Sequence, residues 1–150
     1  MTHTTKTVLH VDDDPSQFPI VAALLEKRGY QVHTTDSPDD VESALLRTGA
    51  RIVLLDIDMP GKDGLTLLKE IKQNDGGIQV IMVTGMVTMA TILRAMRWGA
   101  EACIFKPITD PTALLEALDA TEAKIRRWWR AVEELTQQRR GLEQRIEATG

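Results

Sequence analysis

Residues 52–56 read Ile-Val-Leu-Leu-Asp, four aliphatic residues followed by a carboxylate. A strand with one wet face alternates apolar and polar residues, whereas an uninterrupted aliphatic run is typical of a parallel strand that is covered on both faces. Asp56 then stands at the carboxyl end of that strand, where the chain leaves the sheet. The stretch therefore indicates a buried parallel sheet with an acidic group at its carboxyl edge.

Similar runs lie on both sides of this segment. Short apolar or β-branched runs predict strands at residues 7–11, 30–35, 78–83 and 102–105. Helical patterns follow each strand, and several begin at a proline or a capping residue and end at a glycine. Five strands alternating with five helices predict an α/β fold in which right-handed crossovers build one parallel sheet.

The last helical pattern continues beyond the expected end of a fifth helix. From Leu114 to Ile146 the apolar 4-3 spacing covers more than four heptads. A heptad repeat sustained over this length predicts a left-handed coiled coil. Thr121 and Arg139 interrupt the repeat, and Gly141 weakens the helix interior by about 1 kcal/mol.

We therefore predict a domain at residues 1–122 and a helical extension at 123–150. The extension holds seven lysines and arginines against four glutamates, a mixture too weakly basic to indicate nucleic-acid binding. About thirty residues are also too few for a further output domain. Two interpretations of the extension stay open: a homodimerising coiled coil, or a linker or docking helix for another protein.

The composition indicates the cellular compartment in which the protein is expected. No apolar run approaches the roughly 18–20 residues of a membrane span, and the N-terminus is too polar for a signal peptide. Cys103 is the only cysteine, so an internal disulfide is impossible and a reducing cytoplasm is the expected compartment. By itself Cys103 is expected to be a small buried apolar residue.

Polar residues stand at the ends of four predicted strands, and these ends meet at one edge of a parallel sheet, where ligands bind. They are Asp12 and Asp13, Asp56, Thr84 and Lys106. Clustered carboxylates repel one another and need a cation, and an all-oxygen ligand set suits Mg²⁺. A hydroxyl and an ammonium beside such a site suit the oxygens of a phosphoryl group.

With these residues in place, residues 7–122 resemble the receiver domain of two-component response regulators. The resemblance rests on four motifs at four strand ends: Val11-Asp12-Asp13, Leu55-Asp56-Ile57-Asp58-Met59-Pro60, Val83-Thr84-Gly85 and Phe105-Lys106-Pro107. It implies a flavodoxin-like fold with strand order 2-1-3-4-5. It also implies a non-enzymatic switch that is phosphorylated by a sensor histidine kinase or a phosphotransfer protein.

The same resemblance assigns roles to individual residues. Asp56 resembles the phosphoacceptor, and Asp12 and Asp13 resemble the acidic pair that holds Mg²⁺. The backbone carbonyl of Asp58 is the further metal ligand that the resemblance implies. Thr84 resembles the switch hydroxyl and Lys106 the lysine that contacts the phosphoryl group, with a cis peptide bond before Pro107. A switch of this kind would control dimerisation through the fifth-helix face and the C-terminal helix, or the binding of a partner, without direct contact to nucleic acid or membrane.

Two positions depart from the family pattern. Cys103 occupies the place of the usual aromatic rotamer switch, and a thiol is too small to swing as a ring does. Met86 stands beside the expected route of an attacking water, and an apolar side chain cannot orient water. We therefore predict slow self-dephosphorylation, which Met86→Glu would accelerate.

The polar residues admit other interpretations. Asp56-Ile57-Asp58 also resembles the nucleophile and acid of haloacid-dehalogenase-type phosphatases, but there the pair follows the first strand, and here it follows the third. Asp14 and Asp110 are expected to be turn or helix-cap residues. The three histidines lack metal-ligand spacing and are expected to be structural or solvated; they are His3, His10 and His33.

Overall fold

The computed structural model describes residues 5–85 and 88–149 and contains one parallel sheet. The strand order is β2-β1-β3-β4-β5, as the family resemblance implies. The strands are β1 (Thr7–Val11), β2 (Gln31–Thr35), β3 (Ile52–Leu55), β4 (Gln79–Thr84) and β5 (Ala102–Phe105). The helices are α1 (Gln17–Glu26), α2 (Val41–Thr48) after a short 3₁₀ turn, α3 (Gly64–Asn74), α4 (Met89–Arg97) and α5 (Thr112–Thr149).

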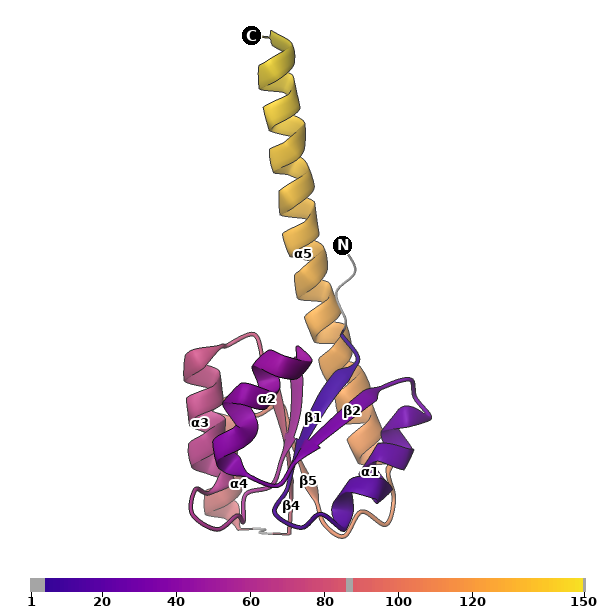
Figure 1. Ribbon diagram of the computed structural model, residues 1–150, viewed down its shortest axis with the longest axis vertical. Helices are drawn as coiled ribbons and strands as arrows, with labels where there is room; N and C mark the ends of the chain where they lie inside the picture. Colours follow the sequence, from indigo (N-terminus) through magenta and orange to yellow (C-terminus); the bar gives the residue numbers. More distant parts are fainter. Residues whose placement is uncertain (1–4, 86–87, 150) are drawn as a thin grey trace.

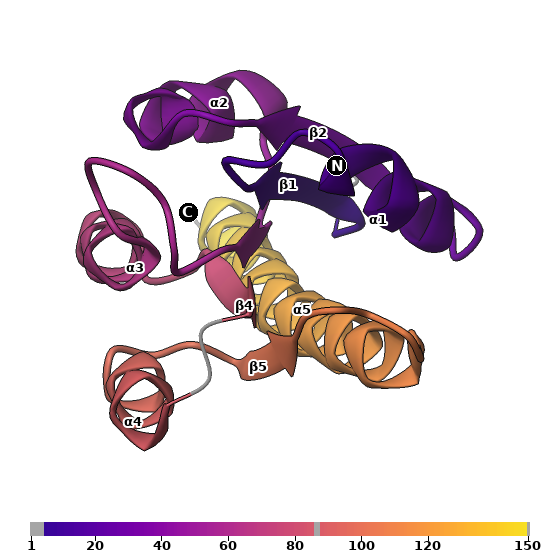
Figure 2. The ribbon, with the colours of Figure 1, turned by 90° about the horizontal axis from the view of Figure 1, so that it is seen from below.

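The sheet lies between two helical layers (Figures 1 and 2). Helices α1 and α5 cover one face, and α2, α3 and α4 cover the other. Each face has its own buried cluster, because alternate residues of the central strands point to opposite sides: Leu55 joins the α2–α4 cluster, and Leu54 joins the α1–α5 cluster. Burial on both sides explains why β3 is wholly apolar and why the middle residues of β1 and β4 are mostly apolar.

The register of the strands brings the predicted polar residues to one edge. Val11 pairs with Leu55, so Asp12 and Asp56 follow neighbouring strands at the same level. Thr84 pairs with Phe105, which places Lys106 just beyond the end of β4. These carboxyl ends lie at the bottom of Figure 1, while α5 projects from the opposite end of the domain.

Helix α5 is one continuous helix of 38 residues, and only part of its heptad pattern is exposed. The first apolar positions pack on the sheet of the same chain: Leu114, Leu118 and Ile125 are buried. The interpretation of the whole repeat as a coiled coil was therefore wrong for its first half, since a 3.5-residue spacing serves equally to seat a helix on its own sheet. Only the positions after Ile125 remain exposed and available to another helix.

Despite its length, α5 is too polar to cross a membrane. Within residues 5–85 and 88–149, none of the helices combines the length and the apolar character that a membrane span requires.

Candidate functional site

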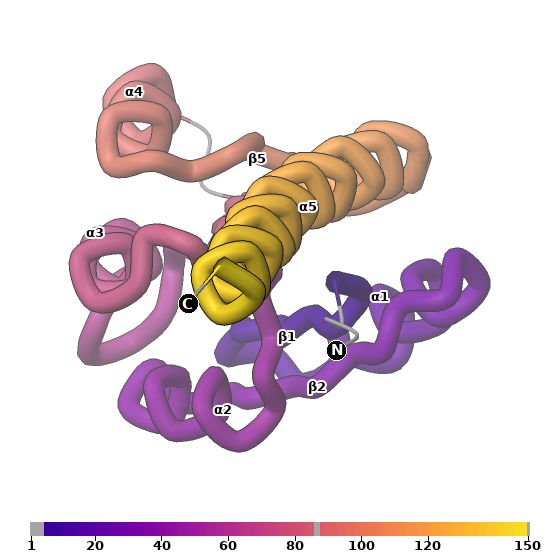
Figure 3. The backbone as a smooth tube through the Cα atoms, turned by 90° about the horizontal axis from the view of Figure 1, so that it is seen from above, coloured from indigo at the N-terminus to yellow at the C-terminus, as the bar shows by residue number. Residues whose placement is uncertain are grey.

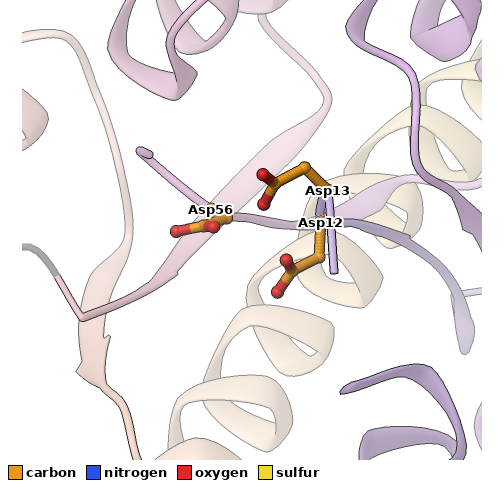
Figure 4. A group of neighbouring side chains, drawn as sticks. All are labelled: Asp12, Asp13 and Asp56. Atoms are coloured by element: carbon orange, nitrogen blue, oxygen red, sulfur yellow. The ribbon is translucent and has the colours of Figure 1, made fainter. Parts of the chain in front are cut away.

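Three carboxylates converge at the carboxyl edge of the sheet (Figure 4). Asp12 and Asp13 follow β1, and Asp56 follows β3; one carboxylate oxygen from each lies within 4.8 Å of the others. Asp12 is fully buried and Asp56 is only 6% exposed, whereas Asp13 is open to solvent. The site is therefore a shallow acidic depression with two buried walls and one exposed side.

Lys106 supplies the positive charge that holds the buried carboxylates together. Its Nζ donates a hydrogen bond to Asp12 Oδ2 at 2.5 Å and lies 3.5 Å from Asp56 Oδ2. Burial alone would lower the pKa of Lys106, but the hydrogen bond to Asp12 and the two negative charges raise it. The ammonium therefore stays charged and neutralises part of the acidic cluster.

The pKa values of Asp56 and Asp13 shift in the same direction. Burial raises the pKa of Asp56, the charge of Lys106 opposes that rise, and the charge of Asp12 adds to it. The pKa of Asp13 is also raised, by partial desolvation and by the charge of Asp12. Because ionisation of these carboxyl groups is unfavourable here, a bound cation would stabilise their charged forms.

The residues present fit a hard divalent cation. Asp12, Asp13 and Asp56 offer only oxygen ligands on converging side chains, which is the donor set that Mg²⁺ prefers. Asp58 lies beside them: its backbone N–H donates to Asp56 Oδ1 at 3.3 Å, and its own side chain is exposed. The exposed side of the depression leaves space for water or a phosphoryl oxygen in the remaining coordination positions.

Thr84 and the loop after β5 complete the edge. Thr84 is 1% exposed, and its side-chain hydrogen bond is one of the interactions that lower the pKa of Asp56. The Lys106–Pro107 peptide bond is cis, which confirms that expectation. The structure thus brings Asp12, Asp56, Thr84 and Lys106 together around one point.

Gly64 shapes the site and was not singled out from the sequence. A Cβ at this position would lie 1.9 Å from the backbone oxygen of Asp56, and the Gly64 N–H donates to the Ile57 oxygen at 2.8 Å. The first turn of α3 therefore packs directly on the backbone of Asp56. Only the dipeptide Asp63-Gly64 signalled this in the sequence, and it indicates a turn rather than a close approach.

His10 lies directly beneath the acidic cluster. Its side chain is 1% exposed, its Nε2 lies 4.0 Å from Asp12 Oδ2, and its ring meets Phe18 edge to face. Burial lowers the pKa of His10 to about 4, although the charge of Asp12 opposes this. Among the described residues, no group forms a hydrogen bond with its Nδ1. His10 is therefore a neutral structural residue, one of the two alternatives expected from the sequence.

Asp14 accepts hydrogen bonds from Ser16, and Asp110 accepts them from Thr112, so both are turn or cap residues as predicted. Cys103 is half-buried against the cluster under α4, and burial raises its pKa. Met86 lies outside the described residues, so its predicted influence on water stays a prediction.

A parallel sheet of order 2-1-3-4-5 with an acidic cluster at its carboxyl edge defines a flavodoxin-like α/β fold whose ligand-binding edge is acidic. The sequence matches the family "Response regulator receiver domain" over residues 8–119. The chain belongs to this family, the receiver domains of two-component response regulators. The match supports a phosphorelay receiver and does not support the haloacid-dehalogenase-type phosphatase.

Individual relatives agree with this assignment. The chain is 32% identical over 117 residues to the C4-dicarboxylate transport transcriptional regulatory protein DctD of Pseudomonas aeruginosa, covering 78% of this chain and 25% of that protein. It is 33% identical over 112 residues to the transcriptional regulatory protein RstA of Escherichia coli, covering 75% and 46%. The chain thus spans between a quarter and a half of the length of these relatives.

Solved structures show the same fold. A CheY-like receiver domain protein from Methanospirillum hungatei superposes with a TM-score of 0.75 at 27% identity, covering 83% of this chain and 98% of that one. The beryllofluoride-activated NtrC4 receiver domain, described as a dimer, superposes with a TM-score of 0.74 at 28% identity, covering 80% and 98%.

Proposed function

We propose that this receiver accepts a phosphoryl group on Asp56 and that phosphorylation controls its association with a second copy or another protein. One observation carries the first part: Asp12, Asp56, Thr84 and Lys106 meet at one edge of the sheet, with Lys106 Nζ 3.5 Å from the Asp56 carboxylate. We assign Asp12, Asp13, Asp56 and the backbone carbonyl of Asp58 to a Mg²⁺ site. The donor is a phosphohistidine, on a sensor histidine kinase or a phosphotransfer protein.

The chemistry is a single transfer. An Asp56 carboxylate oxygen attacks phosphorus, a P–O bond forms as the P–N bond breaks, and the imidazole departs with the electron pair of that bond. A bound Mg²⁺ would supply the positive charge that two approaching anions need. Lys106 adds a fixed positive charge for the oxygens of the phosphoryl group, and the Thr84 hydroxyl donates a hydrogen bond to one of them.

The consequence is proposed to appear on the face formed by α4, β5 and α5. This face carries four exposed apolar side chains: Met89, Leu93, Met96 and Phe105 are between 44% and 74% exposed. Movement of Thr84 toward the phosphoryl group would change the packing under α4. Because Cys103 is too small to act as a swinging ring, the Thr84 movement carries the switch in this chain.

The extension is assigned to self-association. We divide the chain into a receiver at 1–122 and a helical extension at 123–150, and propose that the α5 face and the extension join two copies. The relatives DctD and RstA are transcriptional regulators, but we assign no direct nucleic-acid or membrane contact to residues 1–150. The cytoplasm remains the expected compartment.

The acceptor is tested by phosphorylation with a small phosphoryl donor such as acetyl phosphate, followed by intact-mass measurement. The wild-type chain should gain one phosphoryl group in Mg²⁺ and none in excess chelator. Asp56→Asn should not be labelled, whereas Asp14→Asn removes another carboxylate, in an exposed turn, and should be labelled as wild type. Labelling of Asp56→Asn would refute the assignment of Asp56 as the acceptor. Sustained hydrolysis of a phosphomonoester would instead support the phosphatase interpretation.

The regulatory part is tested by sedimentation with and without beryllofluoride, which mimics a phosphoryl group on aspartate. A monomer–dimer equilibrium that shifts toward the dimer on addition of the mimic is expected. A monomer in both states at high concentration would contradict self-association while leaving Asp56 as the acceptor.

A further inference from the structure

A groove opens at the amino edge of the sheet, at the end of the domain opposite the acidic cluster. It has a volume of about 530 Å³ and lies between the starts of β3 and β4 and the middle of α5. Figure 3 looks down on this edge, and the exposed half of α5, residues 126–149, rises from it toward the viewer. Grooves of this size hold small molecules rather than single ions.

The parallel topology brings the residues of the groove together. Arg51 directly precedes β3, and its carbonyl accepts the N–H of Gln79, the first residue of β4, at 2.8 Å. Gly77 keeps the floor open, because a Cβ there would lie 3.1 Å from Asp75 Oδ1. On the other side, Ile125 anchors α5 by its burial in the core. The groove is therefore built from strand starts and a helix that the core holds in place.

The wall formed by α5 offers an aromatic surface. Trp128 lines the groove and is nevertheless 66% exposed. Trp129 lines it too, but packs partly against the core, and the guanidinium carbon of Arg51 lies 5.5 Å from its ring centre. These contacts hold Trp129 in place, whereas most of the Trp128 indole is accessible to a flat ring from solution.

Three cations line the same groove, and none of its described lining residues is acidic; the cations are Arg51, Lys72 and Lys124. Two of them are oriented by carboxylates that lie outside the lining. Arg51 Nη1 is 2.8 Å from Asp75 Oδ2, and Lys124 Nζ is 2.7 Å from Glu101 Oε1. A ligand would therefore meet cations whose positions are already fixed.

Lys72 carries a charge that no carboxylate pairs with directly. Its Nζ donates to two neutral backbone oxygens, those of Gly76 at 3.0 Å and Ile78 at 2.9 Å, and none of the ion pairs between described residues includes it. Burial lowers the pKa of Lys72, although the charge of Glu101 opposes this. An ammonium has three N–H donors, so one is left for an anion that would stabilise its charged form.

We propose that this groove binds a purine nucleotide, with its base stacked on Trp128 and its phosphate beside Lys72. The ligand has to match a flat apolar wall and a cationic floor within one groove, and a nucleotide joins an aromatic ring to a phosphate. Fused purine rings offer a large face to an indole, and stacking on aromatic side chains tolerates different bases. The site lies at the opposite edge from Asp56, so it stands or falls independently of the phosphoacceptor.

Binding is tested by titration calorimetry of the full chain with AMP, in chelator so that no Mg²⁺ at the acidic edge can hold the phosphate. Saturable binding with a dissociation constant below about 1 mM is expected. Adenosine and inorganic phosphate should each bind about tenfold or more weakly than AMP, because each of them meets only one of the two surfaces. Equal binding of adenosine would overturn the role of the cations, and weaker binding of AMP than about 1 mM would overturn the site.

The position of the ligand is tested by backbone nuclear magnetic resonance under the same conditions. The amide resonance of Gly77, in the groove, should shift with AMP, whereas that of Gly64, packed on Asp56 at the other edge, should stay unchanged. A shift at Gly64 without one at Gly77 would overturn the proposal.

Matched variants test the aromatic wall. Trp128→Ala should weaken AMP binding about fivefold or more, because it removes the stacking surface. Leu135→Ala removes a side chain of α5 that is similarly exposed, at 59%, and does not line the groove, so it should bind AMP as wild type. Both positions are exposed, so neither variant should unfold the domain, and equal binding by Trp128→Ala and wild type would overturn the stacking.

A second pair tests the cation. Lys72→Gln should weaken AMP binding about tenfold or more and leave adenosine binding unchanged. Lys69→Gln, on the same helix but outside the groove, should leave both unchanged. An equal loss with the two variants would overturn the assignment of the phosphate to Lys72.

A short single-stranded oligoadenylate distinguishes a free nucleotide from one within a strand. It presents the same base and phosphate, and it should bind no more tightly than AMP. Tighter binding of the oligonucleotide would overturn the assignment to a free nucleotide.

Discussion

Replacement of His10 should remove a large part of the acid sensitivity of this protein. His10 lies under the acidic cluster with 1% of its side chain exposed, and burial lowers its pKa from 6.5 to about 4. Between these two values the unfolded chain binds a proton at His10 and the folded chain does not. Stability is therefore complete above pH 6.5 and is lost as the pH falls toward 4.

The magnitude follows from the two pKa values of His10. The difference between 6.5 and about 4, at 1.36 kcal/mol per pKa unit, corresponds to roughly 3 kcal/mol once the pH is well below 4. At pH 5 the loss relative to pH 7.5 is about 2 kcal/mol, because the unfolded histidine is then almost fully protonated and the folded one is almost neutral. A loss of that size is a large fraction of the 5–15 kcal/mol typical of a folded domain.

The assay is urea unfolding in chelator at pH 7.5 and pH 5.0, for wild type, His10→Phe and His10→Leu. Both variants should lose about 2 kcal/mol less than wild type between the two pH values, whatever their absolute stabilities. Using two replacements of different shape separates packing from titration, since packing differs between them and the missing proton does not. An equal pH dependence in all three proteins would refute the reasoning.

Three further predictions concern the acceptor site. Gly64→Ala should destabilise the fold by about 3 kcal/mol or more and slow labelling of Asp56, because the added Cβ would collide with the Asp56 backbone. Gly76→Ala is the control for unfolding measurements, since the atom nearest to its added Cβ is 3.8 Å away. Lys106→Ala should bind Mg²⁺ about tenfold more tightly than wild type, because a positive charge 3.5 Å from Asp56 no longer repels the ion. The affinity is measured by titration calorimetry, and an unchanged affinity would contradict the prediction. Met86→Glu should shorten the aspartyl-phosphate lifetime, followed by loss of the mass label, and an unchanged or longer lifetime would oppose the prediction.

The sheet and its acidic edge were predictable because the apolar runs of single strands and the alternation of strands with helices point to the same fold. The run at β3 is apolar because both faces are covered, and the change to Asp56 marks the point where the chain reaches solvent. Parallel strands bring their carboxyl ends to one edge, so the clustering of Asp12 with Asp56 follows from topology alone. His10 and Gly64 were harder to interpret, because their roles depend on which atoms approach them from α1 and from the backbone of Asp56.

The heptad repeat of α5 shows a different limit of sequence reasoning. A helix seated on a sheet and a helix in a coiled coil both place apolar residues three and four apart, so the pattern is the same before and after Ile125. The division depends on where the sheet ends: Ile125 is buried near the start of β4, and Trp128, three residues later, is 66% exposed. Only the three-dimensional position of that edge reveals which half of the heptad repeat is exposed.

The site and the exposed half of α5, residues 126–149, lie at opposite ends of the domain, and α5 is the element that joins them (Figure 1). The chain passes from Lys106, bound to Asp12, to the first turn of α5, where Asp110 accepts the Thr112 N–H at 2.9 Å. A continuous helix is stiff, so a change in the packing of its first half, where Leu114 and Leu118 are buried against the sheet, would also move the exposed half after Ile125.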